Sequence, residues 1–62
     1  MLAEAKLKDG RYVSAYFESR AKTWKGLCRA ARRALAIQSL FEPGTTFMES
    51  DIALLRVNGN AE

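Results

Sequence analysis

The sequence predicts a small α+β domain of ββαβ type, with a three-stranded, mainly antiparallel sheet and one amphipathic helix packed on one face. Three observations predict this fold. Two segments of alternating apolar and polar residues lie within residues 2–18, residues 23–40 show helical spacing, and residues 50–57 are rich in aliphatic side chains. A chain of 62 residues has room for one domain, which we expect to span 1–62.

A hairpin is predicted over residues 2–18. A turn of only two residues would mix apolar and charged side chains on both faces of the hairpin. A three-residue loop, Lys8-Asp9-Gly10, with a type I turn and a bulge at the left-handed glycine, separates them. One face then holds Ala3, Ala5, Leu7, Val13, Ala15 and Phe17. Tyr12 and Tyr16 stand on the opposite face, either in solvent or against a partner.

A helix over about residues 20–40 is predicted next. Ser19 or Thr23 can cap its first turn, because a side-chain hydroxyl accepts a hydrogen bond from an unpaired backbone amide. Its apolar residues fall on one arc that we expect to cover the sheet: Trp24, Leu27, Cys28, Ala31, Ala34 and Leu35. The two largest of these, Trp24 and Leu27, are expected to fill much of the core. Pro43 stops the helix.

A final strand is predicted over about residues 50–57, followed by a polar tail over 58–62. The segment 46–48 either extends this strand or forms a short strand of its own. Because the helix returns the chain in the direction of the second strand, the final strand is expected beside the first and antiparallel to it. The resulting spatial order, 2-1-3, leaves the second strand as an exposed edge.

The composition argues against catalysis. The chain has no histidine, which removes the usual general base at neutral pH and the commonest metal ligand. Its seven acidic residues are scattered along the chain without metal-ligand spacing. Cys28 lies among cationic residues that could activate a thiol, but its place in the apolar arc favours a buried, unreactive side chain. We therefore expect a protein that is not an enzyme, with no cofactor and no metal.

A cytoplasmic location is expected. A single cysteine allows no internal disulfide, as is usual in a reducing compartment. Charged residues at Glu4, Lys6 and Lys8 interrupt the start of the chain where a secretion signal needs an apolar core, and no apolar run approaches the roughly 18 residues of a membrane span. The amphipathic helix is not expected on a membrane surface either, because the core needs its apolar face.

Positive charge is concentrated on the helix. Between Ser19 and Phe41 the chain has six basic residues and no acidic one. Five of them form one stripe away from the apolar arc: Lys22, Lys25, Arg29, Arg32 and Arg33. Like charges at i,i+3 and i,i+4 cost a few tenths of a kcal/mol each, so local stability does not explain the stripe. A solvated helix face is the plain interpretation; an acidic protein surface as partner is the one we favour.

Two other partners remain as alternatives. A basic stripe with exposed Tyr12 and Tyr16 could bind nucleic acid without sequence specificity, the stripe holding phosphates and the tyrosines stacking on bases. The tyrosines are, however, expected on the sheet face away from the helix, and the stripe has no Asn, Gln or Ser to read bases. A second copy of the chain is the other alternative, bound through the exposed sheet face or edge.

The order of elements resembles small phage-encoded proteins that disable host machinery, in particular the phage T7 family of inhibitors of bacterial RNA polymerase. Pro43 after the helix and Arg56-Val57 in the last strand carry the resemblance in residues. It implies an inhibitor that occupies a surface of a host protein, and it adds Arg56 to the expected contacts, because the family has an arginine there that contacts the polymerase. The helix is basic here and acidic in the phage T7 protein, so no shared target is implied.

Overall fold

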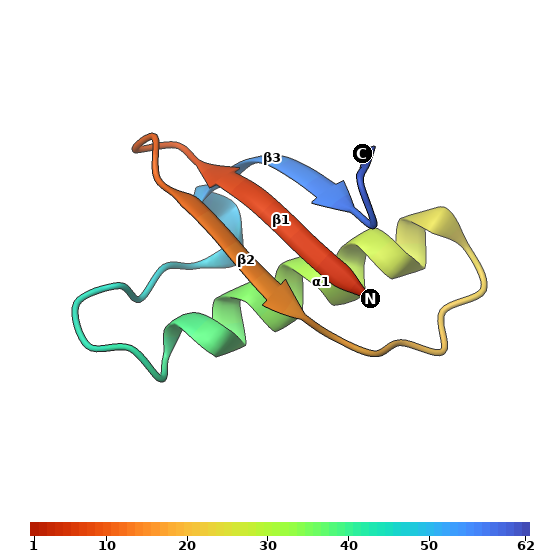
Figure 1. Cartoon of the computed structure of the whole chain (residues 1–62), viewed down its shortest axis with the longest axis horizontal. Coiled ribbons are helices and arrows are strands. Elements are labelled where there is room, and N and C mark those ends of the chain that lie inside the picture. The colour runs from red at the N-terminus through yellow and green to blue at the C-terminus, as the bar shows by residue number, and fades with distance from the viewer.

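The computed structural model describes all residues, 1–62. The elements are β1 (Leu2–Leu7), β2 (Tyr12–Tyr16), α1 (Trp24–Ser39), a 3₁₀ turn η1 (Glu49–Asp51), β3 (Ile52–Val57) and β4 (Asn60–Ala61). The strands form one antiparallel sheet in the order β2-β1-β3-β4, and α1 crosses one face of it (Figure 1). The α+β class, the helix on one face and the neighbour order 2-1-3 are confirmed. The prediction of three strands is wrong, because β4 adds a fourth.

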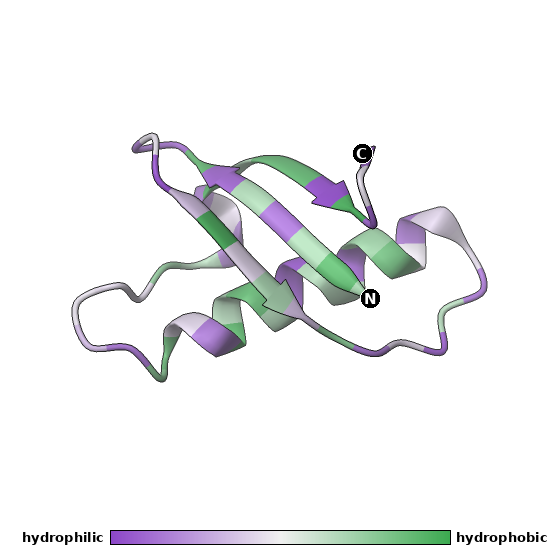
Figure 2. Cartoon of the chain, in the orientation of Figure 1, coloured by the Kyte–Doolittle hydropathy of each residue, from purple (hydrophilic) through white to green (hydrophobic).

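The hairpin has the predicted register. Ala3 pairs with Ala15 and Lys6 with Tyr12. The loop closes where the Leu7 N–H donates to the carbonyl of Arg11 at 2.8 Å. Gly10 has φ +95°, the left-handed conformation that the three-residue loop requires. The apolar side chains of the hairpin consequently share one face, and the bands along β1 and β2 in Figure 2 show the alternation.

The pairing of β1 with β3 contains one irregularity. Lys6 pairs with Leu54 but Leu7 pairs with Ile52, so Ala53 is an extra residue in β3. A bulge of this kind shifts the alternation of side chains by one position. Ile52 and Leu55 are therefore both buried although they are three residues apart.

Helix α1 begins where Thr23 caps it. The Thr23 hydroxyl accepts a hydrogen bond from the Gly26 N–H at 3.1 Å. The alternative cap, Ser19, accepts from the Ala21 N–H and stabilises only the turn before the helix. The helix runs from Trp24 to Ser39. It therefore begins about four residues later than the predicted range of about 20–40 and ends close to the predicted position.

The core lies between α1 and the sheet. Its largest fully buried side chains are Leu7, Leu35, Val57 and Cys28. The prediction that Trp24 fills the core is wrong: as the first residue of α1 it remains 43% exposed. Phe47 is buried in addition, because the chain after α1 folds back against the helix. Ser39 fixes this return by accepting a hydrogen bond from the Phe47 N–H at 3.2 Å.

The segment after β3, predicted as a polar tail, forms a turn and the short strand β4. Asn58 and Gly59 both have positive φ, and the turn they form brings Ala61 beside Arg56 as part of β4. The Glu62 N–H then donates to the carbonyl of Leu55 at 3.0 Å. The final strand itself is Ile52–Val57, since the residues before it form η1. The chain has no helix with the length and apolar character needed to span a membrane.

Candidate interaction surface on the helix

The exposed side of α1 carries a continuous row of side chains at i,i+4 spacing. We call it the helix ridge: Lys25, Arg29, Arg33, Ile37 and Phe41. The first four belong to α1, and Phe41 follows directly after the Leu40 cap, where its N–H still bonds to the carbonyl of Gln38. Residues four apart on a helix are neighbours on its surface. The ridge is therefore cationic over its first half and apolar over its second.

The three cations of the ridge have no acidic partner. Lys25, Arg29 and Arg33 are exposed, and the two ion pairs of the protein involve other residues. The first turn of α1 contains no acid that could offset Lys25 at the positive end of the helix dipole. The repulsion between like charges at i,i+4 is therefore not offset within the protein, and each such pair lowers the stability of the helix by a few tenths of a kcal/mol.

Arg32 corrects the predicted stripe. Its guanidinium points to the other side of α1 and forms a two-pronged ion pair with the carboxylate of Glu62, which follows β4. Hydrogen bonding from Arg32 lowers the pKa of Glu62, and the same contact raises the pKa of Arg32. Arg32 therefore holds the end of the chain against the helix and is not a free cation of the ridge.

Lys22 also departs from the prediction, because it precedes the helix. It is exposed, but it lies in the irregular segment before the Thr23 cap and not on a turn of α1. Its charge adds to the positive field at the start of the ridge without sharing the helical spacing.

The remaining predicted contacts lie on the opposite side of the protein. Tyr12 and Tyr16 are 79% and 83% exposed on the sheet face that α1 does not cover. The Lys6 ammonium lies 5.6 Å from the centre of the Tyr12 ring, a cation–π contact. Arg56 is exposed on the same face, where it pairs in register with Glu4. One flat partner therefore cannot contact the ridge and these residues together.

The sequence interpretation missed the apolar half of the ridge. Ile37 is 46% exposed and Phe41 is 79% exposed, and Leu40 beside them is exposed as well. The sequence contains a pattern that predicts this exposure, because Arg33, Ile37 and Phe41 continue the i,i+4 spacing of the cations. The pattern is weak, since apolar residues near the end of a helix usually belong to the core.

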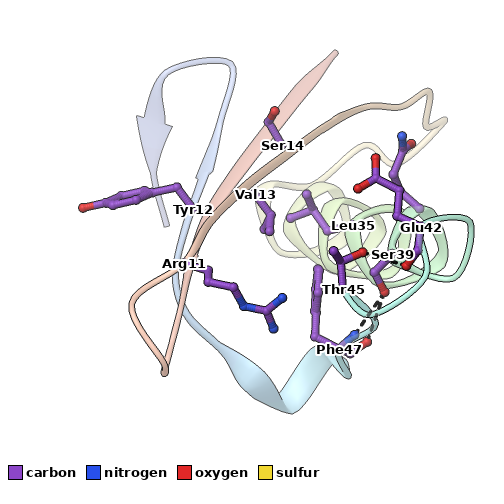
Figure 3. Close-up of a pocket in the computed structure, with 10 residues that line it drawn as sticks. Arg11, Tyr12, Val13, Ser14, Leu35, Ser39, Glu42, Thr45 and Phe47 are labelled. Carbon is purple, nitrogen blue, oxygen red and sulfur yellow. Dashed lines mark hydrogen bonds between the residues drawn. The ribbon is translucent and has the colours of Figure 1, made fainter.

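Cys28 is the one cysteine of the chain, and it is buried in the core. Burial raises the pKa of its thiol, which favours the protonated form. No three His, Cys, Asp or Glu side chains gather to hold a metal ion. A cleft lies between β2 and the end of α1, but its one buried hydroxyl, Ser39, is occupied by backbone groups of Ala36 and Phe47 (Figure 3).

Comparison with protein-family models, with curated proteins and with solved structures finds no match to this chain. The surface must therefore be interpreted from its own chemistry.

Proposed function

We propose that this protein is a non-catalytic interaction module that binds an acidic, amphipathic protein surface through the helix ridge. The observation that carries the proposal is the row of unpaired cations, Lys25, Arg29 and Arg33, followed at the same spacing by exposed Ile37 and Phe41. Inhibition of another protein, as the resemblance to the phage family implies, would be one consequence of occupying such a surface.

Charge selects the class of partner. Cations that repel one another along a helix become favourable when carboxylates of a partner lie between them. Arg is also among the residue types that dominate binding energy at interfaces, because its planar guanidinium can bind a carboxylate through two hydrogen bonds. Arg29 and Arg33 are expected to contribute most for this reason, and Lys25 less.

The apolar half of the ridge favours protein over nucleic acid. A phosphate backbone offers nothing to cover Ile37 and Phe41, whereas a partner helix with acidic residues followed by leucines covers both halves of the ridge. The aromatic residues that could stack on bases, Tyr12 and Tyr16, lie across the sheet from the cations. Nucleic acid is therefore the less favoured partner.

The experiment uses two defined probes and isotope-labelled protein. One probe is a synthetic helical peptide with glutamates and then leucines at i,i+4 spacing, and the other is a single-stranded oligonucleotide. We expect the peptide to shift the backbone NMR signals of Arg29, Arg33 and Ile37 and to leave those of Tyr12 and Tyr16 unchanged. Binding of the oligonucleotide with no response to the peptide would contradict the proposal.

A matched pair of variants distinguishes the effect of the ridge residues on binding from the effect of the protein's net charge. Arg29→Glu with Arg33→Glu is expected to abolish the peptide-induced shifts. Lys8→Glu with Arg56→Glu changes the net charge equally, but both sites lie off the ridge, so binding should persist. Loss of binding only in the second variant would place the site at Lys8 or Arg56, away from the ridge, and would contradict the proposal.

A further inference from the structure

Strand β2 forms a free edge of the sheet. The residues that flank β2 bond toward β1: the Arg11 carbonyl accepts from the Leu7 N–H, and the Phe17 N–H donates to the carbonyl of Met1. The alternation of an antiparallel pair extends this pattern to Val13 and Ala15. In an antiparallel pair the residues between these direct both backbone groups away from the neighbouring strand. Tyr12, Ser14 and Tyr16 consequently present unpaired N–H and C=O groups along the outer side of β2.

This edge lacks the features that normally prevent strand pairing. The segment Tyr12–Tyr16 has no charged residue, no proline and no glycine, and its register with β1 is uninterrupted. Natural edges are usually shielded by inward charges, prolines, bulges or shortness. The opposite edge follows that rule, because β4 is only two residues long. The two edges therefore differ, and β2 offers five consecutive residues for pairing whereas β4 offers two.

We propose that β2 pairs with β2 of a second copy of the chain, antiparallel and centred on Ser14. In this register Ser14 faces Ser14 of the second copy, and Tyr12 faces Tyr16 of the second copy. In a two-fold pairing each contact occurs twice, so Tyr12 of either copy faces Tyr16 of the other. Every free backbone group of these residues then gains a partner.

The exposed tyrosines favour this occupant. Both lie on the open sheet face, and the two-fold pairing brings them together as two aromatic cross-strand pairs, which stabilise antiparallel sheets.

The structure leaves room below the added strand. The cleft in Figure 3 runs beside Arg11–Ser14 of β2, and its apolar floor is formed by Val13, Leu35 and Phe47. Tyr12 points away from it. Because residues directly opposite in a sheet share a face, Ala15 of the second copy would lie against Val13 and cover part of this cleft. The helix ridges of both copies stay exposed on the same side of the joined sheet.

The test measures molar mass against concentration by sedimentation and light scattering. The native protein is expected to pass from monomer to dimer as concentration rises. In Tyr12→Glu with Tyr16→Glu, like charges face each other across the two-fold, and the dimer dissociation constant should rise by about tenfold or more. In Tyr12→Glu with Tyr16→Lys, the same tyrosines are lost but opposite charges face each other, and the dimer should be retained.

Three results would overturn the proposal. They are a native protein that stays monomeric at every concentration, two double variants that associate equally, and two double variants that are both monomeric although folded. A measurement on the native protein alone guards against unfolded variants. Amide hydrogen exchange at Tyr12, Ser14 and Tyr16 should slow as concentration rises, whereas exchange that does not change with concentration would refute pairing at this edge.

Discussion

The two sides of α1 use their residues differently. On the side facing the sheet, Ala31 and Leu35 are buried, and Arg32 beside them is bound by Glu62. On the outer side, Arg33 is adjacent in sequence to Arg32 yet has no acidic partner. Arg32 thus helps to hold the fold together through its ion pair, whereas Arg33 has no ion pair within the protein.

Under the proposed function, the difference separates residues that stabilise the fold from residues that bind a partner. Burial of apolar surface on the inner side supplies most of the favourable free energy of folding. The outer side has like-charged neighbours that slightly oppose folding. Substitutions on the inner side should therefore change the free energy of unfolding, and substitutions on the outer side should change binding.

The largest expected effect on stability comes from Leu35→Ala. Removing a fully buried leucine costs about 3 kcal/mol, which is much of the total stability of a domain of this size. Ile37→Ala is the matched control on the outer side and should change stability by less than about 0.5 kcal/mol, because this side chain is already half exposed. Urea unfolding followed by circular dichroism measures both, and equal losses would contradict the separation of the two sides.

The helix cap gives the next largest effect. Thr23→Ala removes the acceptor for the Gly26 N–H and should lower the free energy of unfolding by about 1 kcal/mol. Ser19→Ala is the control, since that hydroxyl bonds only to the Ala21 amide before the helix and should cost less. Thermal unfolding of the two variants tests the order. If Ser19→Ala cost more, the helix would begin earlier than Thr23.

The Arg32–Glu62 ion pair should contribute less than about 1 kcal/mol, because both side chains are about one-third exposed. Arg32 lowers the pKa of Glu62 below its ordinary value of 4.5 in the folded protein, so the pair stabilises the fold at neutral pH. That contribution is lost as pH falls below 4.5 through the lowered pKa. The native protein should therefore exceed Glu62→Gln in stability at neutral pH and lose this advantage in acid. An advantage independent of pH would contradict the ion pair.

The smallest expected effect on stability is a gain. Arg29→Glu places an acid between Lys25 and Arg33 at i,i+4 and should stabilise the protein by a few tenths of a kcal/mol, or about 2 °C in Tm. Arg29→Gln removes repulsion without adding attraction and should gain less. Differential scanning calorimetry at low salt resolves the two. A loss of stability in Arg29→Glu would mean that Arg29 has an intramolecular role.

Local chemistry explains what could be predicted from the sequence. Gly10 and the alternation of the hairpin were sufficient to give its register, Thr23 was one of two predicted caps, and the crossover rule gave the order of β2, β1 and β3. Each depends on residues close in the chain or on a general rule of connection. The cations at Lys25, Arg29 and Arg33 could be placed on one side for the same reason.

The errors come from contacts between distant residues. Arg32 meets Glu62 thirty positions away, through a turn at Asn58-Gly59 whose continuation into β4 has almost no sequence signal. Trp24 remains exposed because it is the first residue of α1. Phe47 is buried because the chain after α1 folds back, which no local spacing reveals. The apolar end of the ridge was missed because exposure depends on where the sheet lies.

The central claim is that the helix ridge binds an acidic partner, and a charge exchange tests it most directly. Titrations would compare the native protein and Arg29→Glu with Arg33→Glu against two peptides that differ only in having glutamate or lysine at the charged positions. We predict that the native protein binds the glutamate peptide at least about tenfold more tightly than the lysine peptide, and that the double variant reverses this preference. A double variant that still prefers the glutamate peptide would contradict the claim.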